Sequence, residues 1–237
     1  MESNPLNPLS HIETWIFDLD NTLYAGTCEL YREIEQRMAA FIMEELQLDQ
    51  EGAHALRRRF LDRHGTTLKG LMIEHGMAPE RFLDYVHDID LSAVEEDVEL
   101  GEAIAALPGR KLIFTNGTVA HAEKVLNRIG ITHHFGDIFD IVHSDFIPKP
   151  EMEPYRKFVA QTGINPRTSA MFEDIARNLE APHALGMVTV LVTSPENKDA
   201  EHLNKATGGT AQNHIHYVTD DLASFLTGLT KDLKTRS

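Results

Sequence analysis

The stretch Thr14-Trp15-Ile16-Phe17, followed directly by Asp18-Leu19-Asp20-Asn21-Thr22, decides the fold of this chain. The first four residues are β-branched or aromatic, and such a short apolar run is typical of a buried strand. The next five are mostly polar and favour a loop. We therefore predict a buried strand that places two aspartates at its carboxyl end.

Beyond residue 110 the sequence alternates between short apolar runs and amphipathic stretches long enough for helices. The predicted strands are 111–114, 138–142, 170–172, 188–192 and 215–218, and the predicted helices are 118–129, 153–162, 178–185 and 220–229. This alternation indicates right-handed crossovers and a parallel sheet with helices on both faces. The predicted fold class is α/β, with ligands at the carboxyl ends of the strands. Residues 231–237 read as a polar tail.

A segment of different character separates the first strand from the rest of this pattern. Between residues 25 and 97 apolar residues recur at helical spacing, as from Leu30 to Leu46, and no run has a period of two. Further helices are predicted at 53–63, 68–75 and 80–87. We predict an all-helical insertion at 25–97 in a core made of 1–24 and 98–237.

The composition excludes some classes of partner. With 22 basic and 37 acidic residues the formal charge is −15, which argues against binding a nucleic-acid polymer. No apolar run is long enough to span a membrane, and residues 1–13 do not resemble a secretory signal. The single cysteine, Cys28, allows no internal disulfide and fits a cytoplasmic location. The 13 histidines lack the spacing of a zinc site.

Four polar clusters follow four of the predicted strands: Asp18 with Asp20, Thr115-Asn116, Lys149 before a proline, and Glu173-Asp174. Each cluster alone has an ordinary structural explanation, such as a turn, a helix cap or a solvated lysine. All four in this order on one parallel sheet converge at a single edge. The conjunction therefore indicates a functional site rather than four separate turns.

The residue types in these clusters fit phosphoryl transfer. Converging carboxylates repel one another, and a hard cation such as Mg²⁺ relieves that repulsion while leaving room for a phosphate oxygen. Asp18 can then attack phosphorus and form an acyl phosphate. The Thr115 hydroxyl, backbone amides near Asn116 and the Lys149 ammonium can stabilise the transferring charge. Asp20 can protonate the leaving alkoxide and later activate water.

The same residues resemble the four motifs of the haloacid dehalogenase superfamily. The motifs are FDLDNTL at 17–23, Thr115-Asn116-Gly117, Lys149, and Glu173-Asp174, in the family's order and across almost the whole chain. The resemblance implies a Rossmann-like core with a small helical cap inserted after the first strand. It implies that Asp18 is the nucleophile, that Asp20 is the acid/base, and that Thr115 and Lys149 hold the phosphoryl group.

The resemblance also implies the metal ligands and the class of reaction. Asp18, the backbone carbonyl of Asp20, and Asp174 would bind magnesium, with Glu173 as a secondary or water-mediated ligand. The dehalogenases of this superfamily lack a catalytic carboxylate at the position of Asp20, so its presence favours a phosphatase.

Finer similarity points to the pyrimidine 5′-nucleotidase branch. The similar stretches are 15–24, 65–72, 86–91, 107–117 and 172–179, although this branch more usually has serine where Ile175 stands. The implied reaction is hydrolysis of UMP, CMP or a related nucleotide to nucleoside and phosphate.

Candidate substrate contacts are Thr66 and Thr67 from the cap, together with Asn116 and Arg177. Thr66 faces the site or caps a helix, and Arg177 steers an anion or pairs with nearby acids. Lys69, the only lysine of the insertion, reads as a solvated helix residue, which disfavours phosphonatase chemistry. The alternatives left open are a phosphatase of other or broad specificity (pyridoxal phosphate, sugar phosphates), a phosphomutase, and a non-catalytic phosphometabolite-binding protein.

Overall fold

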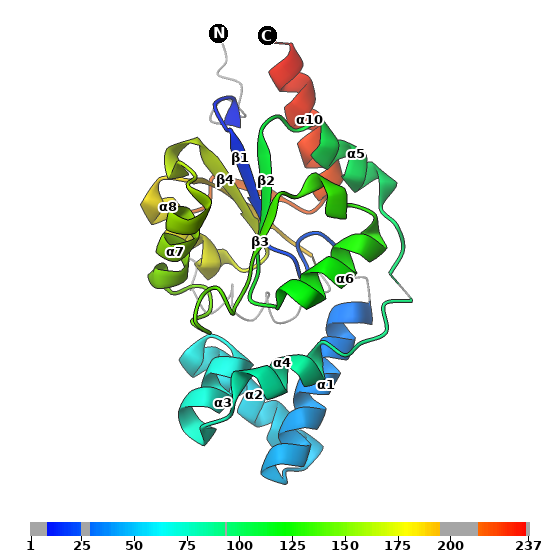
Figure 1. Cartoon of the computed structure of the whole chain (residues 1–237), viewed down its shortest axis with the longest axis vertical. Helices are drawn as coiled ribbons and strands as arrows, with labels where there is room; N and C mark the ends of the chain where they lie inside the picture. The colour runs from blue at the N-terminus through cyan, green and yellow to red at the C-terminus, as the bar shows by residue number, and fades with distance from the viewer. Residues whose placement is uncertain (1–8, 25–28, 93, 195–212, 236–237) are drawn as a thin grey trace.

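A six-stranded parallel sheet forms the centre of the protein in this computed structural model, which describes residues 9–24, 29–92, 94–194 and 213–235. The strand order is β3-β2-β1-β4-β5-β6, so that β1 lies in the middle (Figure 1). Phe17 of β1 is in register with Ile113 of β2 and Phe172 of β4. The strands are β1 Thr14–Phe17, β2 Arg110–Phe114, β3 Asp137–Phe139, β4 Ser169–Glu173, β5 Val188–Val192 and β6 Tyr217–Thr219. The predicted α/β class with a parallel sheet is confirmed.

Helices cover both faces of the sheet because successive strand residues point to opposite sides. Trp15 and Phe17 pack in one buried cluster with residues of α5, α6 and α10, whereas Ile16 packs in a second cluster with residues of α7. The helices of this part are α5 Val98–Ala106, α6 Val119–Ile129, α7 Met152–Thr162, α8 Glu180–Leu185 and α10 Leu222–Lys234, with short 3₁₀ helices at Thr132–His134, Pro166–Thr168 and Ala176–Leu179.

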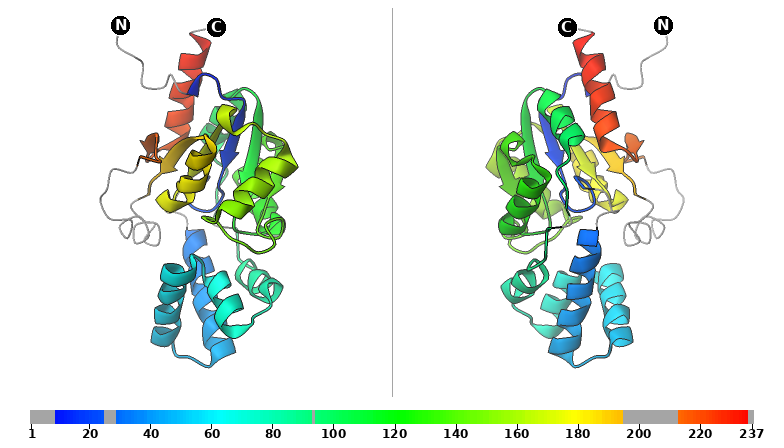
Figure 2. Two further views of the ribbon diagram at one scale, coloured as in Figure 1. Left: turned by 90° about the vertical axis from the view of Figure 1, so that its left-hand side faces the viewer. Right: turned by 90° about the vertical axis from the view of Figure 1, so that its right-hand side faces the viewer.

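Four helices form a separate unit beyond the carboxyl ends of the strands (Figures 1 and 2). They are α1 Glu29–Leu46, α2 Gln50–His64, α3 Thr67–His75 and α4 Pro79–Val86. Their inward faces build a third buried cluster that includes Phe41, Phe60 and Phe82. Within the described residues 29–92 no strand occurs, as predicted. We retain 25–97 as the proposed cap, with 1–24 and 98–237 as the proposed core; residues 25–28 lie outside the described part.

Several sequence predictions are wrong in their boundaries, among them that of α2, which begins at Gln50 rather than residue 53. The strand predicted at 138–142 ends at Phe139, because Ile141 is apolar for another reason: it packs into the helical unit's cluster. The helix predicted at 178–185 begins with a 3₁₀ turn and becomes α-helical only at Glu180. The expected polar tail from residue 231 is helical to Lys234, since Leu233 packs against the core.

One further helix, α5, has no counterpart in the sequence prediction. Its Gly101 weakens the helical signal, although a Cβ at this position would make only ordinary van der Waals contact with Ile131 Cγ2, at 3.4 Å. None of the helices in the described part of the chain combines the length and apolar character needed to cross a membrane.

Candidate active site

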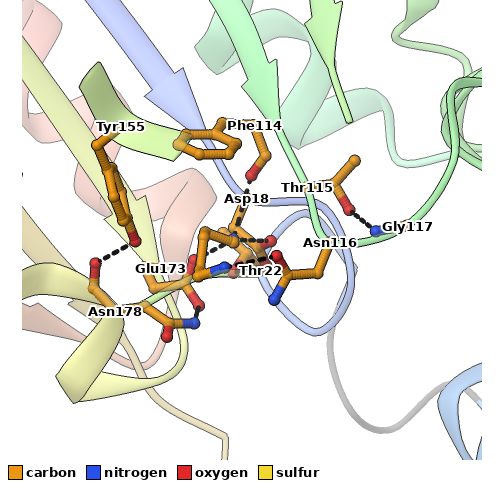
Figure 3. Close-up of polar contacts among 10 residues, drawn as sticks. Asp18, Thr22, Phe114, Thr115, Asn116, Gly117, Tyr155, Glu173 and Asn178 are labelled. Carbon is orange, nitrogen blue, oxygen red and sulfur yellow. Dashed lines mark hydrogen bonds and ion pairs between the residues drawn. The ribbon is translucent and has the colours of Figure 1, made fainter. Parts of the chain in front are cut away.

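The four predicted polar clusters meet at the carboxyl edge of the sheet, where Figure 3 shows Asp18, Thr115, Asn116 and Glu173. Asp18 follows β1, Thr115 follows β2, and Glu173 ends β4, so three adjacent strands deliver these side chains. Lys149 comes from the loop between β3 and α7. The structure thus brings together the residues that the sequence placed at separate strand ends.

Lys149 lies at the centre of the site and is only 2% exposed. Its ammonium Nζ donates to Asp18 Oδ1 at 2.6 Å, to Glu173 Oε2 at 2.7 Å and to the carbonyl of Phe114 at 3.1 Å. Burial disfavours the charged amine, but Asp18 and Glu173 outweigh this and raise the pKa of Lys149 above its ordinary value. Lys149 therefore stays cationic although it is buried.

Three buried carboxylates could hold a metal ion. One oxygen each of Asp18, Glu173 and Asp174 lies within 4.8 Å of the others. Burial and the charge of Glu173 raise the pKa of Asp18 to about 7, although Lys149 lowers it. Burial and the charges of Glu173 and Asp18 raise the pKa of Asp174 well above its usual value. This oxygen donor set carries excess negative charge, so it fits a hard divalent cation.

The three carboxylates are not equivalent. Both oxygens of Glu173 are engaged, since Oε2 accepts from Lys149 and Oε1 accepts from Asn178 Nδ2 at 2.7 Å. The carbonyl of Asn178 in turn accepts from the Tyr155 hydroxyl at 2.6 Å. Glu173 thus has few lone pairs left for a direct metal bond, whereas it holds Lys149 in place.

Asp20 occupies a different setting, next to a buried imidazole. Its Oδ1 accepts from the Tyr24 hydroxyl at 2.6 Å and lies 2.8 Å from His121 Nε2. Burial raises the pKa of Asp20, but the charge of His121 and the hydrogen bonds from His121 and Tyr24 lower it to about 2. Asp18 and Asp20 thus lie in different electrostatic settings, the first beside Glu173 and Lys149 and the second beside His121 and Tyr24.

The residues after β2 orient the loop that faces Asp18. Thr115 is buried and its Oγ1 accepts from the Gly117 amide at 2.9 Å, while Thr22 donates to Asp18 Oδ2 at 3.0 Å. Asn116, predicted to contact substrate, accepts from the Lys149 amide through its Oδ1 at 2.9 Å. This contact gives Asn116 a role in holding the Lys149 loop.

A pocket opens from this site toward the helical unit. Its volume is about 1040 Å³, which includes some bulk solvent at the opening. Thr66, Thr67 and Arg177 are among the residues that line it. Thr66 also caps α3, because its Oγ1 accepts from the Lys69 amide at 3.1 Å. Arg177 donates to the Gly65 carbonyl at 2.9 Å and interacts electrostatically with the carboxylates of Asp62 and Glu180.

The prediction that Lys69 is a solvated helix residue is wrong, because its side chain joins the helical unit to the core. Its Nζ donates to Glu151 Oε1 at 2.6 Å across this junction. Sequence reasoning also missed His121, Tyr24 and Asn178. Tyr24 and Asn178 lie outside the four motifs but inside the similar stretches 15–24 and 172–179, so their proximity to the site could have been suspected. His121 stands among the apolar positions of α6.

Comparisons with known proteins agree with this architecture. The haloacid dehalogenase-like hydrolase family matches residues 12–186, well over half of the chain. Phosphate metabolism protein 8 of Saccharomyces cerevisiae (strain ATCC 204508 / S288c) is 26% identical over 197 residues, which cover 76% of this chain and 61% of that protein. The chain thus spans about three fifths of that relative's length.

Solved structures resemble the fold at low identity. An L-2-haloacid dehalogenase from Xanthobacter autotrophicus superposes with a TM-score of 0.54 at 15% identity, covering 91% of this chain and 97% of that one. A 2-haloacid dehalogenase from Pseudomonas syringae pv. Tomato DC3000 gives a TM-score of 0.53 at 15% identity, covering 95% and 99%. Because the family match over residues 12–186 covers strands β1 to β4 and the helical unit, the chain belongs to the haloacid dehalogenase-like hydrolases.

Proposed function

We propose that this chain is a magnesium-dependent phosphomonoesterase that forms an aspartyl-phosphate on Asp18, with pyrimidine nucleoside monophosphates as preferred substrates. The observation that carries the chemistry is the buried set of Asp18, Lys149 and Asp174 with a second carboxylate, Asp20, two residues after the first. Asp18, the backbone carbonyl of Asp20, and Asp174 would hold Mg²⁺, and Glu173 would act through Lys149. The cation would neutralise carboxylate and phosphate charge.

The reaction has two halves. An oxygen of Asp18 attacks phosphorus while the bond from phosphorus to the ester oxygen breaks, and Asp20 gives its proton to the departing alkoxide. Asp20, now a carboxylate, takes a proton from water, which attacks the acyl phosphate and releases phosphate and free Asp18. Lys149 and the Thr115 hydroxyl stabilise the charge of the phosphoryl group throughout.

The residues that line the pocket favour a leaving group with a flat apolar ring and polar atoms at its edge. From the helical unit the lining is mostly apolar, including Ile34, Met38 and Phe82. Arg57 is the one arginine or lysine that this unit's described residues contribute to the lining, and it is 9% exposed. It forms an ion pair with Glu35, so its charge is already balanced.

A balanced guanidinium suits a neutral acceptor better than a second anion, because an anion would compete with Glu35. A pyrimidine base offers apolar ring faces and carbonyl oxygens at its edge. Pyridoxal phosphate also has a flat ring with a polar edge, so it is the second candidate that this pocket favours.

The test is phosphate release with Mg²⁺ from UMP, CMP, AMP, pyridoxal phosphate, ribose 5-phosphate and p-nitrophenyl phosphate. We expect UMP or CMP to lead, and both Asp18→Asn and chelation to abolish turnover. Arg57→Met should lower kcat/KM for UMP about 10–100-fold more than for p-nitrophenyl phosphate, as loss of a charged hydrogen bond implies. Arg58→Met, an exposed neighbour on α2, is the control.

A different leading ester with the same dependence on Asp18 and Mg²⁺ would refute the nucleotide preference and keep the phosphatase chemistry. Full activity of the Asp18→Asn protein would refute the chemistry itself.

A further inference from the structure

The carboxylate of Asp20 is held through one of its two oxygens. Tyr24 and His121 both bind Oδ1, at 2.6 and 2.8 Å, and Asp20 lines the pocket. Two partners on Oδ1 leave Oδ2 as the oxygen that can exchange a proton with a leaving group. The orientation of the carboxyl group is therefore set by a tyrosine and a histidine that the four motifs do not include.

These two partners connect Asp20 to both chain segments that join the core to the helical unit. Tyr24 is the last described residue before the chain enters that unit, and His87 follows α4, where the chain returns. The ring of His87 stacks on the ring of His121, with centroids 4.3 Å apart and planes at 11°. One segment thus contacts Asp20 directly, and the other contacts it through a single imidazole.

A purely space-filling role for His121 is a poor explanation. His121 is 1% exposed, and its neighbours on the inward face of α6 are apolar, such as Ala122 and Val125. Its Nδ1 is buried without a hydrogen-bond partner among the described residues. A buried polar atom without a partner costs about 1–3 kcal/mol, so an apolar side chain would fill the space at lower cost.

The surroundings are also shaped to the imidazole. A Cβ on Gly117 would lie 3.2 Å from His121 Cδ2 and 3.7 Å from Asp20 Oδ2, so a glycine leaves room for the pair. Thr118 contacts the other ring, with its Oγ1 3.4 Å from His87 Nδ1. The arrangement of His87, His121 and Asp20 is thus fixed by the loop after β2 as well as by the helical unit.

We propose that His121 is the positioning residue that orients the carboxyl group of the acid/base Asp20. Tyr24 and the stacked ring of His87 then make the orientation of this carboxyl group depend on the two chain segments that enter and leave the helical unit. The inference rests on the proposed function, because it concerns the proton that Asp20 gives to the leaving oxygen. In that step the bond between phosphorus and oxygen breaks, its electron pair stays on the oxygen, and the proton of the Asp20 carboxyl group moves to that oxygen.

The leaving group provides a readout that a merely structural role would not move. An alkoxide needs a proton as it departs, whereas p-nitrophenolate departs without one. His121→Leu should therefore lower kcat/KM for UMP about 100-fold, the size of effect that misplaced catalytic groups give, and for p-nitrophenyl phosphate only a few-fold. His121→Gln, which keeps a donor near the position of Nε2, should recover much of the loss.

Two milder variants keep the inference testable if His121→Leu does not fold. Tyr24→Phe should show the same selective loss at a smaller size, and His87→Phe should retain more UMP activity than His87→Ala because it keeps the stacked ring. The control is His54→Leu, which replaces an exposed histidine on α2 and should leave kcat/KM for both substrates unchanged.

Equal losses on both substrates in folded variants would overturn the inference and leave the phosphatase chemistry intact. An inactive wild-type protein would instead overturn the proposed function.

Discussion

Replacing Lys149 by methionine tests the electrostatic account of the site most directly. Methionine keeps an unbranched side chain but removes the charge that contacts Asp18 Oδ1 at 2.6 Å and Glu173 Oε2 at 2.7 Å. The side chains of Lys149 and Glu173 are each 1% exposed and that of Asp18 is 8% exposed, so solvent compensates little for the lost partner. Breaking a buried ion pair costs ~3–5 kcal/mol.

This cost is a large part of the ~5–15 kcal/mol by which folded proteins are stable. For a chain of this size each kcal/mol shifts the midpoint of thermal unfolding by about 2–4 °C, so we expect a decrease of roughly 6–20 °C. The measurement is thermal and urea unfolding in the presence of a chelator. Adding Mg²⁺ should stabilise the variant more than the wild type, because a cation takes over part of the charge balance.

The control is Lys157→Met, which removes an ammonium that pairs with Asp145 at the surface. Exposed pairs contribute about 0–1 kcal/mol, so this variant should unfold close to the wild type. If Lys149→Met is destabilised no more than Lys157→Met, the buried carboxylates do not depend on the lysine, and the charge argument for the site is wrong.

Further predictions concern stability and metal binding. Gly70→Ala should destabilise the protein by ~1–3 kcal/mol, because its Cβ would lie 2.7 Å from Phe60 Cβ, whereas Gly228→Ala meets nothing within 4 Å and should be neutral or stabilising by up to ~1 kcal/mol in urea unfolding. Thr66→Ala should cost ~1 kcal/mol through loss of the α3 cap while Thr66→Ser costs little; equal stability of the two would contradict the cap assignment. Mg²⁺ at 100 times its dissociation constant should stabilise the wild type by about 2.7 kcal/mol, and Asp174→Asn should lose most of that gain in calorimetry; an unchanged gain would remove Asp174 from the ligand set.

The sheet and the convergence of its polar ends could be predicted because both depend on local pattern. The buried strand at 14–17 and the parallel sheet follow from short apolar runs separated by helices, whereas the place of β1 between β2 and β4 comes from the structure. Parallel strands that end in Asp18, Thr115 and Glu173 must place these residues at one edge. Errors arose where an apolar residue served another part of the molecule, as Ile141 does in the helical unit.

The individual roles of the site residues depend on tertiary contacts that sequence spacing does not encode. Asn116 is predicted to contact substrate from its place after β2, and the structure adds a second contact, since its Oδ1 accepts from the amide of Lys149 while the residue also lines the pocket. His121 lies 101 positions from Asp20 in the chain and only 2.8 Å from it in space. No local pattern distinguishes that histidine from the apolar residues beside it.

The adjacent acids Glu173 and Asp174 show how the structure divides roles that the sequence leaves equal. A motif of two carboxylates suggests two metal ligands, but Lys149 and Asn178 occupy both oxygens of Glu173. A lysine held by two carboxylates keeps its proton even though it is buried, so Glu173 secures the charge that would stabilise the phosphoryl group in the proposed reaction. Asp174 would then be left for the metal ion. On this reasoning Glu173→Gln should weaken phosphate binding through Lys149 more than it weakens metal binding, and Asp174→Asn should do the reverse.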